Sequence, residues 1–309
     1  MAPDLQGMVY MSDSSWWGSF PEMERSDLRA IRKTLDGAYR DFSREYGDLI
    51  ESLFDPLLSF LVWFEKLLIT TPWLIILAAC TGLVYAASRS WKLAVGCFAS
   101  LILIGYFGMW EDTMRTLSII TVCTMLSILL GIPIGIAMAR SDRVQSIVTP
   151  MLDVMQTMPA FVYLIPVVML LGIGKIPGLI AVVIYAIPPV IRLTNLGIRL
   201  VDKEVLEAAT AFGANRSQRL WGVQLPLAMP TIMAGINQTI MMALSMVVIA
   251  SMIGVKGLGQ PVLKSITNQY FTLGLLNGFA IVALAILFDR ASQAYAKRTQ
   301  AHLGDMKHD

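Results

Sequence analysis

Long apolar runs separated by short polar loops are the feature that most limits what this chain can fold into. One of them, residues 67–87, has the sequence LLITTPWLIILAACTGLVYAA. A helix needs about 20 mainly apolar residues to cross a bilayer. The chain is therefore predicted to be an all-α integral membrane protein. About seven transmembrane helices are expected, over residues 67–87, 93–110, 114–139, 151–172, 176–198, 230–253 and 273–288.

The composition supports a membrane protein and argues against several soluble classes. Of the 309 residues, 56% are hydrophobic and 15% are charged, whereas soluble domains have about 25% charged residues. The formal net charge of +2 is too small to indicate nucleic acid binding. Cys80, Cys97 and Cys123 lie inside apolar runs, where free thiols pack as small hydrophobic side chains. With both His in the C-terminal tail, no Cys and His cluster is expected to bind a metal.

Basic residues in the short loops predict the orientation, because cytoplasmic loops are enriched in Lys and Arg. If the polar loop at residues 202–226 is cytoplasmic, loops on its side carry thirteen Lys and Arg and the opposite loops carry four. Seven spans then place the N-terminus outside and the tail, residues 291–309, in the cytoplasm.

The part of the chain before the first span is predicted to be a periplasmic arm, residues 1–66. Residues 1–20 form a polar leader, and a mixed-charge helical pattern follows over residues 21–50. Residues 51–66 are apolar but too short to span, so an interfacial helix is expected there. Residues 67–110 are then two peripheral spans.

A polar segment, residues 202–226, interrupts the apolar pattern with a predicted helix, turn and helix. Gly213 supplies the backbone freedom that ends the first helix, and Asn215 is placed to cap the second. Leu225 and Pro226 are expected to stop that second helix. These residues alone leave two interpretations open. The segment is either a docking plug for a soluble partner or a loop held against lipid headgroups by Arg216, Arg219 and Trp221.

The same segment contains a recognisable string: Glu207-Ala208-Ala209, then Gly213, then Leu225-Pro226. It resembles the EAA loop (E-A-A-x3-G, then L-P) of ATP-binding-cassette importer permeases. Roughly residues 105–290 resemble the permeases of the glycine betaine/proline betaine (ProU-type) importers, most densely over 152–177, 183–199 and 230–259. The resemblance implies a type I importer permease with a five-helix core, residues 111–290, and cytoplasmic coupling helices. The implied ATPase-coupling residues are Glu207, Ala208, Ala209, Phe212, Gly213, Arg216, Leu225 and Pro226.

The resemblance also implies the partners and the cargo. In that family the permease is a homodimer in the bacterial inner membrane, with two cytoplasmic ATP-binding subunits and a periplasmic substrate-binding protein. The implied cargo is a small quaternary ammonium or methylated-amine osmolyte, such as glycine betaine, proline betaine, choline or trimethylamine N-oxide. The chain has no G-x-x-x-x-G-K-[ST] string, which would cradle nucleotide phosphates. It is therefore expected to be no enzyme and to hold no cofactor, with ATP and Mg²⁺ bound by the partner ATPase subunit.

Five residues in the spans are candidates for a translocation path. A quaternary ammonium group is attracted to aromatic faces, which favours Phe161, Tyr163 and Tyr185. Asn237 and Gln238 are polar residues in the sixth apolar run. They are candidates for the path or for hydrogen bonds between helices.

Asp153 is an acid at membrane depth, where ionisable residues often serve function. We expect it to pair with Arg140 or Arg143 near the interface. The main competing hypothesis is a stand-alone secondary transporter or channel. Such a protein needs an ion relay inside the membrane, and a single acid is not enough to form one. A membrane-bound interaction or sensor protein is a second competing hypothesis, and an ABC permease for a different small cargo is a third. Co-purification with an ATPase subunit separates the first two from the importer hypothesis.

Overall fold

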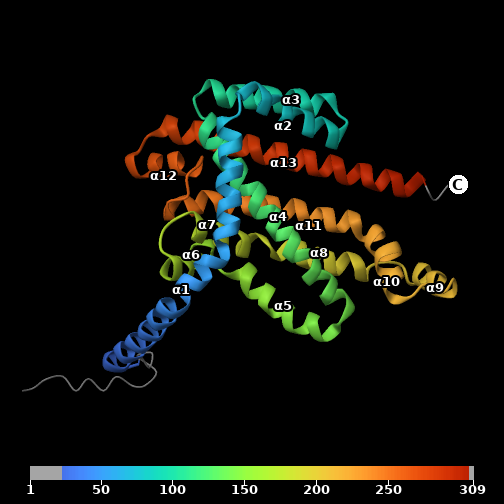
Figure 1. Cartoon of the computed structure of the whole chain (residues 1–309), viewed down its shortest axis with the longest axis horizontal. Coiled ribbons are helices and arrows are strands. Elements are labelled where there is room, and N and C mark those ends of the chain that lie inside the picture. The colour runs from blue at the N-terminus through green and yellow to red at the C-terminus, as the bar shows by residue number, and fades with distance from the viewer. Residues whose placement is uncertain (1–22, 306–309) are drawn as a thin grey trace, which may run out of the picture. The chain divides into compact units, whose positions relative to one another are not determined.

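The computed structural model describes residues 23–305, with side chains to residue 295, and every regular element in that part is helical (Figure 1). The leader expected over residues 1–20 lies outside the described residues. The chain divides into two units, residues 1–49 and residues 50–309. The helices are α1 (Arg25–Thr70), α2 (Trp73–Ser88), α3 (Trp91–Tyr106), α4 (Trp110–Arg140), α5 (Asp142–Thr157), α6 (Ala160–Leu171), α7 (Lys175–Ala186), α8 (Pro188–Arg199), α9 (Lys203–Ala211), α10 (Arg216–Arg219), α11 (Leu225–Ala250), α12 (Gly259–Asn268) and α13 (Phe271–Asp305).

The all-α membrane fold is confirmed. Among the described residues, four helical stretches are long and apolar enough to cross a membrane, and six are if each of two bent helix pairs counts as one span. α3 is a shorter apolar helix. The expected spans correspond to the two bent pairs, to α3 and to the four long stretches Trp110–Arg140, Lys175–Arg199, Arg216–Ile253 and Phe271–Tyr295.

Two of the expected spans are not single helices. The stretch 151–172 is divided between α5 and α6, which meet at an angle of 102°. Met158 has an extended backbone there, because the ring of Pro159 disfavours the helical conformation of the preceding residue. The stretch 67–87 is divided in the same way at Pro72, where α1 and α2 meet at 111°. Each of these two stretches was predicted as a single span, and the structure divides each of them into two helices.

Residues 51–66 are not a separate short helix, because they continue α1 to Thr70 with Pro56 inside the helix. Leu61 is 1% exposed and belongs to the main apolar cluster. Glu65 is buried, and its carboxylate lies 2.6 Å from Lys175 Nζ on α7 and 3.7 Å from Arg115 Nε on α4. The end of α1 is therefore attached to the core, and the interfacial position expected for this segment stays a prediction.

The centre of the core is α8, which packs between α4 and α11 (Figure 1). A Cβ added to Gly135 of α4 would lie 2.8 Å from the carbonyl oxygen of Ile191. A Cβ added to Gly235 of α11 would lie 2.9 Å from Leu193 Cβ. Glycine is thus required on both sides of α8 for the backbones to come this close.

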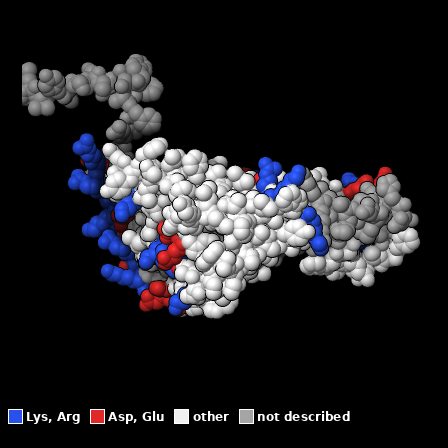
Figure 2. Space-filling view, turned by 90° about the horizontal axis from the view of Figure 1, so that it is seen from above, with Lys and Arg blue, Asp and Glu red and all other residues white. Residues whose placement is uncertain are grey.

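The outer surface suits a lipid environment. Figure 2 shows a wide uncharged area across the middle of the face in view. Large apolar side chains are exposed on the peripheral helices, for example Leu83 of α2, Leu103 of α3 and Phe279 of α13. In a bilayer such side chains contact acyl chains, which carry no penalty for apolar exposure.

Candidate functional site

The predicted helix, turn and helix is present as α9 and α10, and its first half is fixed by local hydrogen bonds. The Asp202 side chain caps α9 by accepting from Glu204 N at 3.0 Å. At the other end, Gly213 has φ of +83°. Ala214 N donates to Ala209 O at 3.0 Å, and Gly213 N donates to Thr210 O at 2.9 Å. This is the Schellman termination, in which a glycine takes the left-handed conformation just past the helix end.

The second half is fixed by a reciprocal cap at Asn215. Its side-chain oxygen accepts from Gln218 N at 2.9 Å, and the Gln218 side chain accepts from Asn215 N at 2.8 Å. Such a capping box satisfies two donors that a helix start leaves free. Arg219 Nη1 also donates to Thr210 Oγ1 at 2.9 Å, so α10 is tied directly to α9. The loop therefore has a defined shape of its own.

Leu225 and Pro226 do not stop the second helix, contrary to the sequence prediction. α10 continues through a π-helical turn, Leu220–Gln224, directly into α11. Pro226 lies in the first turn of α11, directly after the π-helical turn and therefore inside a continuous helical stretch. Leu220 is 2% exposed and packs in an apolar cluster with Ile198 of α8. The loop is thus joined rigidly to the core helices.

The exposure of the expected coupling residues is uneven. Phe212 is 92% exposed and Trp221 is 62% exposed, although both are large apolar side chains. Ala209, Leu225 and Pro226 are half-buried, whereas the other expected residues are exposed, namely Glu207, Ala208, Gly213 and Arg216. Exposed aromatic side chains on a shaped polar unit are typical of a protein-binding site. The structure brings the expected residues together on one small unit.

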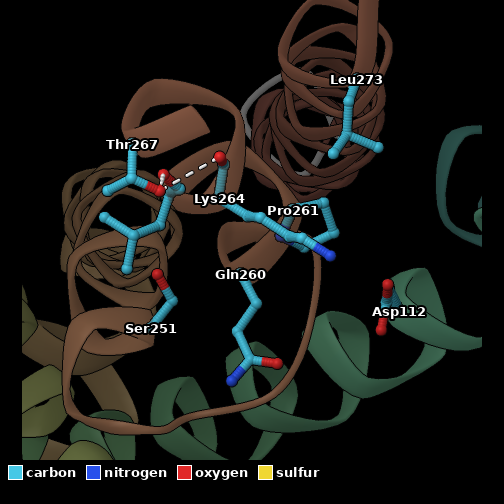
Figure 3. Close-up of a pocket in the computed structure, with 8 residues that line it drawn as sticks. Asp112, Ser251, Gln260, Pro261, Lys264, Thr267 and Leu273 are labelled. Carbon is cyan, nitrogen blue, oxygen red and sulfur yellow. Dashed lines mark hydrogen bonds between the residues drawn. The ribbon is translucent and has the colours of Figure 1, made fainter. Parts of the chain in front are cut away.

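The opposite end of α11 adjoins an open pocket (Figure 3). α11 has 26 residues and is about 39 Å long at 1.5 Å per residue, which is enough to cross a bilayer. The pocket has a volume of about 540 Å³ and lies between the start of α4, the end of α11, α12 and the start of α13. Its polar lining includes Asp112, Ser251, Gln260, Lys264 and Thr267. The α9–α10 unit and this pocket therefore lie at the two ends of one helix.

The three aromatic path candidates do not form one site. Tyr163 and Tyr185 are in edge-to-face contact, with ring centroids 5.8 Å apart. Tyr163 is 5% exposed and donates its hydroxyl proton to the carbonyl oxygen of Met155. Phe161, on the same helix α6, is 54% exposed and has no ring contact with either tyrosine among the described residues. The tyrosine pair packs inside the core, and a role for any of the three in a path stays a prediction.

Asn237 joins α11 to α13. Its Nδ2 donates to Asp289 Oδ1 at 2.8 Å, and its Oδ1 accepts from Ser292 Oγ at 2.6 Å. Asn237 therefore forms hydrogen bonds between helices, which is one of the two roles considered for it from the sequence. Gln238 is exposed and takes no part in this network. Asp289 was not among the predicted residues, and the only sequence signal for it is its position at the end of the last apolar run.

Asp153 pairs with neither Arg140 nor Arg143. Its carboxylate forms an ion pair with Arg192 of α8. Arg143 is on the same helix as Asp153, ten residues away and therefore about 15 Å along the axis of α5, whereas the packing of the core brings Arg192 of α8 next to Asp153. In the described part of the chain no group of three or more Cys, His, Asp or Glu side chains is placed to hold a metal ion.

Comparison with known proteins gives a family and several relatives. Residues 131–301 match the family described as "Binding-protein-dependent transport system inner membrane component". The chain is 47% identical over 243 residues to the glycine betaine/proline betaine transport system permease protein ProW of Escherichia coli K12, covering 77% of this chain and 67% of the relative. It is also 47% identical to the glycine betaine/carnitine transport permease protein GbuB of Listeria monocytogenes, covering 74% of this chain and 82% of the relative.

A more distant relative is the trimethylamine N-oxide transport system permease protein TmoV of Pelagibacter ubique, which is 38% identical to this chain. The matched region covers 76% of this chain and 33% of the relative. Among solved structures, the inward-facing MetNI methionine ABC transporter matches with a TM-score of 0.55 and 19% identity. That match covers 60% of this chain and 93% of the solved chain. At this identity the match shows a shared fold and carries no argument about cargo.

Proposed function

Because the chain belongs to the family of binding-protein-dependent transport system inner membrane components, we propose that it is the permease subunit of an ATP-driven importer for small quaternary ammonium or methylated-amine solutes. It is a membrane component of an ABC transporter. In the proposal two copies form a homodimer that encloses the translocation path. A substrate-binding protein delivers the cargo on one side, and two ATPase subunits dock on the other.

The observation that carries the proposal is the exposure of two aromatic side chains, Phe212 in the turn between α9 and α10 and Trp221 in the π-helical turn that follows α10. Phe212 and Trp221 are apolar side chains that the chain leaves uncovered, next to the Glu207-Ala208-Ala209 string. α9 and α10 are fixed by their own hydrogen bonds, so a partner meets a preformed plug and loses little entropy on binding it. An ATPase subunit with an apolar cleft is the partner that this plug fits.

The proposed transmission of force follows from the contacts behind the plug. Leu220 is anchored between α8 and α11, and α8 is packed tightly against α4 and α11 through Gly135 and Gly235. Movement of the plug therefore moves these helices together. A ligand shifts such an equilibrium only by its differential affinity for the two states. ATP on the ATPase subunits and the loaded binding protein must thus both favour the outward-open form.

The proposed cargo class rests on the relatives. The names of those that match over most of this chain refer to glycine betaine, proline betaine, carnitine or trimethylamine N-oxide. All of these are small molecules with a methylated nitrogen. In the proposal the chain holds no ATP or Mg²⁺ itself, because the ATPase subunits bind both.

The test is ATP-dependent uptake by liposomes that contain the permease, its ATPase subunits and a cargo-loaded binding protein. The cargo panel contains labelled glycine betaine, proline betaine, choline and trimethylamine N-oxide. The variant is Phe212→Ala, and the matched control is Phe279→Ala on α13, where the residue is also exposed, at 62%. We expect Phe212→Ala to weaken co-purification of the ATPase and to lower uptake at least tenfold, since interface aromatics contribute about 2 kcal/mol or more. Phe279→Ala is expected to change neither.

Two outcomes would overturn the proposal. Normal ATPase retention and uptake in Phe212→Ala would show that the plug is not the docking site. Absence of uptake for every methylated amine in a complex with active ATPase would show that the cargo class is wrong.

A further inference from the structure

The pocket at the far end of α11 has opposite charges on its two sides. Asp112 is on the α4 side, and Lys264 extends from α12 across the pocket toward that side (Figure 3). Lys264 is exposed and forms no ion pair with any described residue. A free ammonium group therefore faces the open space of the pocket.

The side that carries Asp112 has a surplus of negative charge. Arg115 forms ion pairs with three carboxylates. Its Nη1 lies 3.2 Å from Asp112, its Nε lies 3.7 Å from Glu65, and its Nη2 contacts Glu111. Lys175 is the only other cation among the described residues of this group, and it pairs with Glu65 at 2.6 Å. Three carboxylates thus share two cations. The Asp112 side chain is paired with Arg115 and is 33% exposed, and it is the carboxylate of this group that lines the pocket.

The size of the pocket suits a small molecule. Sites for small ligands usually have volumes of about 300–1,000 Å³, and this one has about 540 Å³. Gln260 points into the same space with an exposed side-chain amide that has no hydrogen-bond partner in the described part of the chain (Figure 3). Such an amide can donate to an anionic oxygen or accept from an ammonium group.

From this arrangement we infer that the pocket binds a small zwitterion, with the anionic oxygen group at Lys264 and Gln260 and the cationic nitrogen at Asp112. The inference rests on the proposed function for its biological meaning. If the α9–α10 plug faces the ATPase, the pocket opens on the side where cargo arrives. It then serves as an acceptor site that receives a betaine from the binding protein before the path opens.

The chemistry of the lining indicates weak binding. The described residues around the pocket include no aromatic ring, and an aromatic cage is what gives quaternary ammonium groups tight binding. Lys264 and Asp112 are also partly screened by water, which limits exposed charge pairs to about 1 kcal/mol each. An acceptor site benefits from this weakness, because bound cargo must leave again toward the path.

The same chemistry occurs in two sources, a soluble betaine and the headgroup of a zwitterionic phospholipid. The experiment separates them by using nanodiscs of phosphatidylglycerol alone and nanodiscs that also contain phosphatidylethanolamine. The complex of permease and ATPase subunits is used without the binding protein. Binding of glycine betaine and of choline, which has the cation but no carboxylate, is followed by saturation-transfer NMR.

The variants are Lys264→Gln and Asp112→Asn, with Lys256→Gln as a matched control. Lys256 is an exposed lysine in the turn over residues 254–258, before α12, and does not line the pocket. We expect Lys264→Gln to weaken glycine betaine binding roughly threefold to tenfold, as for loss of one exposed charge pair, and to leave choline binding unchanged. Asp112→Asn is expected to weaken both ligands, and Lys256→Gln neither.

Equal glycine betaine binding by the parent and both pocket variants would overturn the inference. Loss of betaine binding in nanodiscs with phosphatidylethanolamine, but not in those without it, would assign the pocket to a lipid headgroup and overturn its role as a cargo acceptor. The proposed function is tested separately by liposome uptake in the parent complex. If the parent imports methylated amines while the pocket variants bind like the parent, only the acceptor site is wrong.

Discussion

The α9–α10 plug and the packing around α8 are held together in opposite ways. The plug is stabilised by hydrogen bonds between residues close in sequence, such as Asn215 with Gln218, and it leaves Phe212 uncovered. α8 makes its contacts with helices distant in sequence, and Gly135 and Gly235 allow the close approach. We therefore expect the plug to keep its fold when a side chain is removed from it, whereas the packing around α8 has no room for an added side chain.

The largest expected effect comes from adding a side chain beside α8. Gly135→Leu places atoms where Ile191 O and Thr194 Cβ already lie, 2.8 Å and 2.6 Å from the new Cβ. Overpacking usually costs about 1–3 kcal/mol, and the cost is at the upper end where backbone atoms are the obstacle. We expect the monodisperse peak in size-exclusion chromatography to be lost. Gly82→Leu on α2, where nothing lies within 4 Å, serves as the control, and equal behaviour of the two variants would contradict the packing argument.

The second-largest effect is expected at Gly213, in the turn of the plug. Gly213→Val is expected to leave the permease inserted and folded but to lower ATP-dependent uptake. A β-branched residue at φ of +83° costs about 1–2 kcal/mol, which corresponds to roughly a factor of 5–30 in the population of the docking shape. Gly213→Asn should retain most of the uptake, because asparagine tolerates the left-handed conformation. Wild-type uptake by the valine variant would count against a docking role for this turn.

A smaller effect is expected where α11 and α13 are joined by hydrogen bonds. Asn237→Leu removes the donor to Asp289 and the acceptor for Ser292. Hydrogen bonds between membrane helices contribute about 0.6–1.7 kcal/mol, so the thermal midpoint of the purified permease should fall by a few degrees. Gln238→Leu changes the exposed neighbour and should not shift the midpoint. A shift of equal size in both variants would show that polarity of α11, and not this network, is responsible.

The smallest effect tests the corrected partner of Asp153. Asp153 and Arg192 are 58% and 34% exposed, so their ion pair contributes at most about 1 kcal/mol. Asp153→Asn should lower the thermal midpoint slightly, and the loss should disappear when Arg192→Gln is already present. Arg143→Gln changes the partner expected from sequence. Its effect on the thermal midpoint should be the same whether or not Asp153→Asn is present. Coupling between Asp153 and Arg143 in such a double-mutant cycle would restore the original assignment.

The apolar runs predicted the helices well, because membrane insertion depends on local composition. The turn inside the plug was also predicted, since Gly213 and Asn215 act on neighbouring backbone groups, whereas the predicted end of the plug at Leu225 and Pro226 was wrong. The large changes of direction at Met158 and at Pro72 were not predicted, because a proline inside an apolar run is compatible with a mild kink or with a full change of direction. Only contacts with the rest of the core decide between these, as they also decide the partner of Asp153.

The same limit applies to the pocket and to the charges beside it. Glu65, Arg115 and Lys175 lie in separate helices, and α12 was not foreseen because residues 259–268 have no long apolar run. Their grouping is a product of tertiary packing, and no spacing in the sequence records it. Whether Phe161, Tyr163 and Tyr185 line a path is likewise a property of the assembled permease.

The π-helical turn at Leu220–Gln224 determines how the plug is rotated about the axis of α11. A helix with one inserted residue is underwound there, and each residue of an α-helix corresponds to about 100° of rotation. The direction in which Phe212 points around the axis of α11 therefore depends on the winding of this five-residue stretch at the base of the plug. Deleting one of its residues would leave the plug folded but rotate it about the helix axis by about 100°, so that Phe212 would no longer face its partner.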